Sequence, residues 1–70
     1  MSNNFYVHTP AGEEIHLGQY TATYGFTYRA NPGVDGYETW RKQFDLGVIR
    51  DECGREVSRE EMAEIADSRG

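Results

Sequence analysis

The residues best suited to chemistry in this sequence lie in segment 20–28, where two kinds of side chain alternate. A period of two predicts a strand with aromatic side chains on one face and hydroxyl side chains on the other. Hydroxyls beside a guanidinium suit a phosphate or a ribose, and aromatic rings can stack on a base. The even positions are Tyr20, Ala22, Tyr24, Phe26 and Tyr28, and the odd ones include Thr21, Thr23, Gly25 and Thr27, followed by Arg29.

We therefore predict a site for a small phosphorylated or nucleotide-like ligand on this strand. Tyrosine and tryptophan are common in binding surfaces because each brings a large contact area and one polar group. The more ordinary alternative is an outer sheet face without a ligand. The predicted ligand-binding residues are Thr21, Thr23, Tyr24, Thr27, Arg29, Trp40 and Arg41.

A second candidate surface is the acidic segment 50–70. It holds seven acidic residues and four arginines, a balance of −3. Glu60, Glu64 and Asp67 have a spacing that places them on one face of a helix. Such a face could dock on a basic partner, for example a host defence or nucleic-acid enzyme. The alternative is a solvated helix face.

The histidines do not predict a metal site. His8, Glu14 and His16 share one face of a predicted hairpin if Val7 pairs with Ile15. Two imidazoles and a carboxylate can bind a metal, but no ligand motif of fixed spacing is present. We therefore interpret them as surface cross-strand pairs and predict no metal.

The sequence also lacks a catalytic motif. Cys53 lies in a predicted turn beside Gly54, which is a poor setting for a nucleophile. No Gly-rich phosphate loop, supported catalytic triad or carboxylate pair is recognisable. We therefore predict a binding protein without a cofactor rather than an enzyme.

Three strands are predicted in the first part of the chain. Residues 5–8 and 14–17 alternate apolar and polar side chains, and together they predict an antiparallel hairpin. Gly18 predicts a break or bulge in the second strand. A third, continuous strand is predicted over 20–28, with a bend at Gly25.

A helix is predicted over residues 36–46. Asp35 is the expected N-cap, and Glu38, three residues later, would complete a capping box. Gly47 is the expected glycine that follows the helix C-terminus.

The last part of the chain predicts a short hairpin and a second helix. Strands over 48–50 and 55–57 flank the turn, and Ser58 is the expected N-cap of a helix that ends near residue 67. The predicted order is βββαββα in a single domain over 1–70. The fold class is therefore α+β, with a small antiparallel sheet of three strands plus a short hairpin, one packed helix and a short C-terminal helix.

Composition excludes several classes of protein. Aromatic residues make up 13% of the chain and charged residues 27%, which is not typical of a disordered protein. No apolar run is long enough to span a bilayer, and the N-terminus does not resemble a signal peptide. The single cysteine fits a reducing cytoplasm. The net charge of −5 argues against direct nucleic-acid binding.

The length of the chain predicts association between subunits. Folding 70 residues buries roughly 7,000 Å², and the apolar part of that area contributes about 105 kcal/mol. Ordering the chain costs about the same. Because a lone cysteine cannot form an internal disulfide, we expect a homo-oligomer.

Five short motifs occur in order along residues 5–66. They are Ile15-His16-Leu17-Gly18, Tyr24-Gly25-Phe26, Trp40, Asp51-Glu52-Cys53-Gly54-Arg55 and Ser58-Arg59-Glu60-Glu61-Met62. The series resembles a family of small uncharacterised proteins of phages and prophages. The resemblance implies a phage accessory protein that acts inside a bacterium, and it implies no particular activity. Many members carry a Cys-x-x-Cys pair near the N-terminus that this chain lacks, so no metal role is implied.

Taken together, these features predict a small phage-encoded anti-defence protein in the cytoplasm of a host bacterium. It would sequester a nucleotide-derived bacterial immune signal in a pocket at a subunit interface. One alternative is an acidic inhibitor that binds a host defence or nucleic-acid enzyme. A second alternative is a structural or virion accessory protein.

Overall fold

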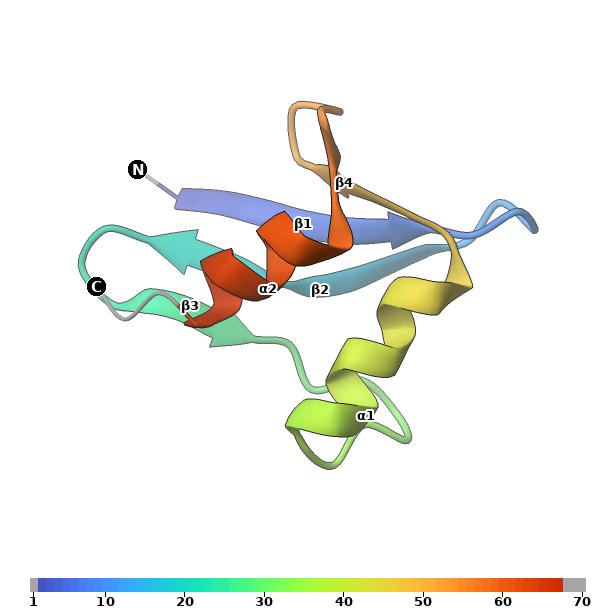
Figure 1. The fold of residues 1–70 in the computed structure, drawn as a ribbon, viewed down its shortest axis with the longest axis horizontal. Coiled ribbons are helices and arrows are strands. Elements are labelled where there is room, and N and C mark those ends of the chain that lie inside the picture. The colour runs from blue at the N-terminus through green and yellow to red at the C-terminus, as the bar shows by residue number, and fades with distance from the viewer. Residues whose placement is uncertain (1, 68–70) are drawn as a thin grey trace.

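A five-stranded antiparallel sheet forms one layer of the structure, a computed structural model that describes residues 2–67. The two α-helices and a 3-10 helix lie on one side of it (Figure 1). The strand order is β3-β2-β1-β4-β5, so β1 is central. The predicted α+β class and the order βββαββα are confirmed. The elements are β1 Ser2–His8, β2 Glu14–Thr21, β3 Gly25–Tyr28, α1 Tyr37–Lys42, η1 Gln43–Leu46, β4 Val48–Asp51, β5 Glu56–Val57 and α2 Arg59–Asp67.

The hairpin of β1 and β2 has the expected register, in which Val7 pairs with Ile15. The register shifts farther along, because Phe5 lies opposite Gly18 while Tyr6 lies opposite His16. The extra residue of β2 at this point is a β-bulge, as predicted from Gly18. A Cβ on Gly18 would lie 2.6 Å from the ring of Phe26, so only glycine fits here.

The prediction of one continuous strand over 20–28 is wrong. β2 ends at Thr21, and the chain reverses before β3 begins at Gly25, which has φ 75°. Tyr20 and Phe26 lie directly opposite each other in the resulting hairpin. Even-numbered residues of the two strands therefore share a face, just as they would in one long strand. The alternation does not distinguish these two structures.

The helix over 36–46 is confirmed as α1 continued by η1, but its N-cap differs from the prediction. Gly36 is the N-cap, in an extended conformation with φ −170°. The Thr39 hydroxyl accepts a hydrogen bond from the Gly36 N–H (3.0 Å) and donates one to Asp35 Oδ1 (2.8 Å). Thr39, rather than Glu38, therefore satisfies the backbone at the start of the helix.

Gly47 is needed for a different reason from the one predicted. Its φ of 175° is extended rather than left-handed. A Cβ at Gly47 would lie 2.7 Å from the carbonyl carbon of His8 and 2.8 Å from the Cα of Thr9. Glycine is required because the chain passes against the end of β1 as it leaves η1.

The predicted short hairpin and final helix are confirmed. Strands β4 and β5 extend the main sheet, because Ile49 of β4 pairs with Val7 of β1. The Ser58 hydroxyl accepts a hydrogen bond from the N–H of Glu61 (3.0 Å) and so caps α2.

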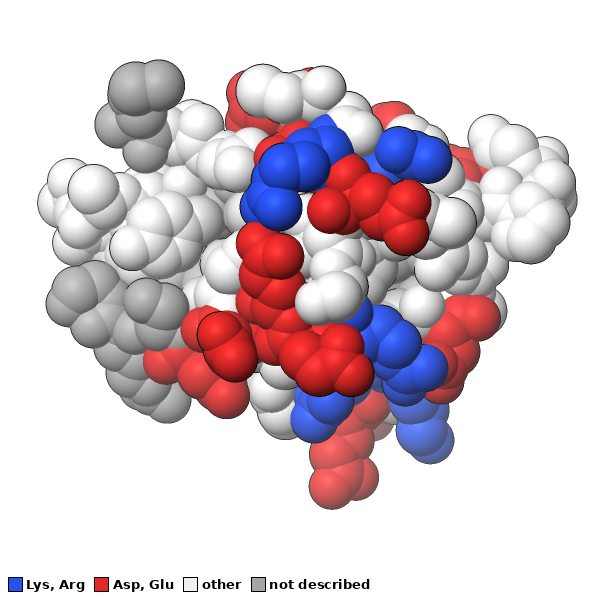
Figure 2. Space-filling model, turned by 45° about the horizontal axis from the view of Figure 1, so that its top comes forward, with Lys and Arg blue, Asp and Glu red and all other residues white. Residues whose placement is uncertain are grey.

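Charged side chains of both signs intermingle on one face of the molecule (Figure 2). Arg59 at the start of α2 forms an ion pair with Asp45 (2.6 Å). Arg55 forms one with Glu61 (2.7 Å). These arginines are therefore held by carboxylates near the N-terminal part of α2.

The core lies between the sheet and the helices. The indole N–H of Trp40 donates a hydrogen bond to the carbonyl of Leu17 (2.8 Å), which fixes α1 to the bulged strand. No helix within residues 2–67 is both long enough and apolar enough to cross a membrane. The buried hydrophobic residues are Phe5, Val7, Leu17, Trp40, Phe44, Ile49, Val57, Met62 and Ala66.

Candidate functional site

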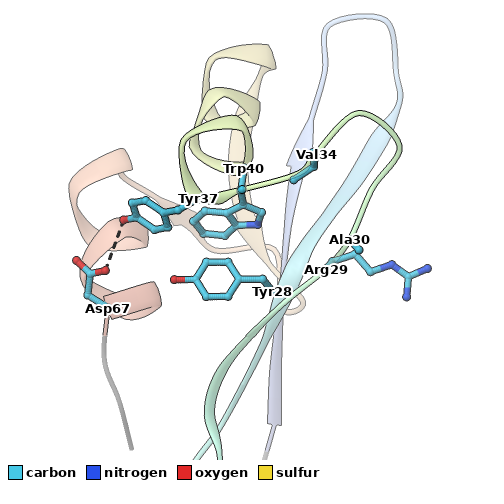
Figure 3. A pocket seen from close by; sticks show the side chains of 8 residues that line it. Tyr28, Arg29, Ala30, Val34, Tyr37, Trp40 and Asp67 are labelled. Carbon is cyan, nitrogen blue, oxygen red and sulfur yellow. Dashed lines mark hydrogen bonds between the residues drawn. The ribbon is translucent and has the colours of Figure 1, made fainter.

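A pocket of about 590 Å³ opens among β3, α1, the loop between them and the C-terminal end of α2 (Figure 3). Its volume is within the range of small-molecule sites, roughly 300–1,000 Å³. The lining residues are Tyr28, Arg29, Ala30, Val34, Gly36, Tyr37, Trp40 and Asp67.

Three aromatic rings dominate the pocket. Trp40 is 1% exposed, whereas Tyr28 is 43% and Tyr37 39% exposed. The centroid of the Trp40 ring lies 4.6 Å from that of Tyr28 and 5.9 Å from that of Tyr37. The tryptophan thus packs against two half-exposed tyrosines, whose exposed surface can contact a planar ligand.

The pocket tyrosines are held at both ends. Their backbones belong to β3 and α1, and both hydroxyls contact the last residues of α2. The Tyr28 hydroxyl donates a hydrogen bond to the carbonyl of Ala66 (3.2 Å). The Tyr37 hydroxyl donates a longer one to Asp67 Oδ1 (3.5 Å; dashed in Figure 3). The rings are therefore oriented before any ligand binds.

The two charged residues of the pocket lie on opposite sides of the rings. Asp67 lies beside the hydroxyl of Tyr37, whereas the guanidinium of Arg29 extends away from the rings on the other side (Figure 3). The pocket thus has an anionic wall and a cationic rim. A ligand with donors at one end and negative charge at the other would match both.

The predicted ligand-binding set is divided in the structure. Arg29 and Trp40 line the pocket. Arg41 lies next to it, with its guanidinium carbon 5.9 Å from the centroid of the Tyr37 ring. The structure thus groups these residues with Tyr28 rather than with the threonines.

The remaining predicted residues do not line this pocket. Thr21, Thr23 and Tyr24 lie at the β2–β3 turn, where the Thr21 hydroxyl accepts a hydrogen bond from the Tyr24 N–H (3.0 Å). Thr27 pairs with Gln19 and alternates with the core-facing aromatics, so it points to the other face of the sheet.

The predicted ligand-binding residues include neither of the two tyrosines that line the pocket, and Asp67 was given a different role. Tyr37 and Trp40 are three residues apart, a spacing that places both on one side of a helix. Tyr28 belongs to the aromatic face of the predicted strand and directly precedes Arg29. Asp67 was predicted only as part of an acidic stripe. The structure places Asp67 at the pocket, where it is exposed, as Glu60 and Glu64 are on the same helix.

The histidines form local contacts on the open face of the sheet. His8 Nε2 lies 3.6 Å from Glu14 Oε2. His16 Nε2 lies 3.0 Å from Asn4 Oδ1, and its ring stacks on Tyr6 at 5.0 Å. Within residues 2–67, no group of three His, Cys, Asp or Glu side chains is placed to hold a metal ion.

Comparisons with known proteins identify no relative. No protein-family model matches the chain, and neither the curated proteins nor the solved structures contain a match. The pocket is therefore interpreted from its own geometry.

Proposed function

We propose that the protein is a small binding protein whose aromatic pocket takes a nucleotide-derived molecule. The observation that carries this proposal is the pocket itself, in which the half-exposed rings of Tyr28 and Tyr37 share the lining with Arg29. Stacking on an aromatic ring suits every base, because every base has a π-face. The guanidinium at the rim would attract a phosphate.

The biological role that fits this binding is sequestration of a nucleotide-derived immune signal. The resemblance to small phage and prophage proteins supports an anti-defence role in the cytoplasm of a host bacterium. A binding protein that withdraws a signal needs affinity and abundance but no catalytic group. The pocket has a volume suited to a base with its sugar.

We also propose that the protein forms a homo-oligomer. For a chain of 70 residues, the free energy gained by burying apolar surface only about balances the entropic cost of folding. Leu46 and Val48 are exposed apolar residues on either side of Gly47. An interface that covers them would remove apolar surface from water.

The test is calorimetric titration of the protein with AMP, GMP, CMP and UMP, repeated with Tyr37→Ala. We expect at least one nucleotide to bind. Removing the Tyr37 ring should weaken its binding by roughly five- to a hundred-fold, since stacking is worth about 1–3 kcal/mol. Tyr24→Ala is the matched control, because Tyr24 is 82% exposed and does not line the pocket.

Two results would contradict the proposal. If none of the four nucleotides binds at millimolar concentration, the pocket does not take this ligand class, and the exposed acidic face of α2 becomes the better candidate. If Tyr24→Ala and Tyr37→Ala weaken binding equally, the ligand does not occupy the pocket. Circular dichroism and the melting temperature of each variant show whether the fold is retained.

A further inference from the structure

We infer that the pocket selects a guanine base, because its α2 wall presents hydrogen-bond acceptors. This inference rests on the proposed binding of nucleotides and specifies the base. The juxtaposition that carries it is the carboxylate of Asp67 beside the exposed rings of Tyr28 and Tyr37.

Two acceptors form this wall. The carbonyl of Ala66 accepts the hydroxyl of Tyr28. Asp67 adds a carboxylate, which accepts the hydroxyl of Tyr37 through Oδ1 at 3.5 Å. A carboxylate has about four lone-pair sites, so it can accept further donors.

Among the bases, guanine is the one that offers two adjacent donors to such a carboxylate. Its N1–H and 2-amino group point in the same direction and can form two parallel bonds with the two carboxylate oxygens. Adenine presents a donor next to the lone pair of N1, which would face a carboxylate oxygen. The pyrimidines present at most a single donor beside an acceptor. An acceptor of the base that faces a carboxylate oxygen forms no hydrogen bond with it, so the other bases would lose this contact.

The position of Arg29 is consistent with this orientation. Asp67 and Arg29 lie on opposite sides of the aromatic rings (Figure 3). Because the rings of Tyr28 and Tyr37 are inclined at 78° to each other, a base can stack on only one of them. A guanine that stacks on Tyr37 with its donor edge toward Asp67 would direct its sugar and phosphate toward the side of the pocket where Arg29 lies. The protein has a net charge of −5, but in this orientation the ligand's phosphate lies away from Asp67. The acidic wall then faces only the uncharged base.

The test is to compare the dissociation constants of GMP, IMP and AMP by calorimetric titration. IMP retains N1–H and lacks the 2-amino group, so it can form one of the two bonds. We expect GMP to bind more tightly than IMP, and IMP more tightly than AMP. Each step should be roughly ten-fold or more, because hydrogen bonds to charged groups are among the stronger ones.

The decisive variant is Asp67→Asn, with Glu64→Gln as its control. The amide that replaces the carboxylate would turn either its NH₂ group or a single acceptor toward the base, so GMP should bind roughly ten-fold or more weakly. AMP should not lose affinity in this way. Glu64 is exposed on the same helix and does not line the pocket, so Glu64→Gln should leave all three affinities unchanged.

Each other outcome has a definite meaning. Equal affinities for GMP and AMP, or a guanine preference that survives Asp67→Asn, would overturn the inference and leave the proposed function intact. Absence of binding by all three nucleotides would overturn the proposed function and this inference with it. Unchanged melting temperatures would show that Asp67→Asn acts on binding rather than on folding.

Discussion

At the scale of single residues, Asp51 organises the turn between β4 and β5. Its Oδ1 accepts hydrogen bonds from the backbone N–H groups of Cys53 and Arg55, both at 2.9 Å. Its Oδ2 lies 3.5 Å from the Arg55 guanidinium. The bond from the Arg55 N–H is the largest cause that lowers the pKa of Asp51, and it outweighs burial, which raises the pKa. The folded state therefore favours the charged carboxylate.

This lowered pKa predicts how the protein responds to acid. A carboxyl whose pKa is lower when folded stabilises the protein above its unfolded pKa of about 4 and ceases to do so as the pH falls through the folded value. Asp51→Asn should therefore lower the melting temperature at neutral pH. The difference from the unmodified protein should shrink as the pH falls below about 4. Thermal unfolding monitored by circular dichroism across this range measures it.

Glu60→Gln is the control for this prediction, because Glu60 is exposed on α2. It should alter the melting temperature much less than Asp51→Asn at neutral pH. A difference between Asp51→Asn and the unmodified protein that stays constant down to strong acid would show that the charge of Asp51 does not contribute.

At the scale of elements, the connection from η1 to β4 depends on Gly47. The position that a Cβ would occupy at Gly47 lies against the backbone at the end of β1, where the nearest atoms belong to His8 and Thr9. Backbone cannot move aside as a flexible side chain can. A side chain at Gly47 would push η1 and β4 apart from β1.

Gly47→Ala should therefore destabilise the protein by about 1–3 kcal/mol or more, the usual cost of overpacking. Chemical denaturation measures the change in the free energy of unfolding. Gly36→Ala is the matched control, because a Cβ at Gly36 would meet only the Thr39 hydroxyl oxygen, at 3.9 Å. If the two variants lose equal stability, the close approach at Gly47 is not the cause.

Structural features that depend on residues close together in the sequence could be predicted from it. The first hairpin, the bulge at Gly18 and the Ser58 cap follow from local patterning, and the structure confirms them. The β2–β3 turn was missed because alternation is the same for one strand or two. The pocket could be predicted only in part, because the contact of Asp67 with Tyr37 joins residues 30 positions apart. Such a contact arises from how α2 packs, which local patterns do not specify.

At the scale of the whole molecule, one sheet face carries the helices and the other carries His8, His16 and Thr27. The surface also retains exposed apolar side chains, among them Leu46 and Val48. The chain is small, so any apolar area it leaves in water is a substantial fraction of what it can bury. Association between subunits would reduce that exposure.

Native mass spectrometry should therefore detect a homo-oligomer, and Leu46→Glu should convert it to a monomer. A carboxylate placed in an apolar interface must lose its hydration without gaining a partner. Ala22→Glu is the control, since it adds the same charge at the exposed β2–β3 turn. A monomer in the unmodified protein would contradict this proposal and restrict the pocket to residues of a single chain.

The hydroxyl contacts of Tyr28 and Tyr37 give the last turn of α2 a second role. This turn is an element of secondary structure and also one wall of the pocket. Helix ends open more easily than helix centres. A ligand held between the rings and Asp67 would stabilise the closed turn, and closure would in turn strengthen binding by the same factor. If the pocket binds a ligand as proposed, its occupancy and the folding of the last turn of α2 are thus coupled, and binding should increase the helical order of that turn.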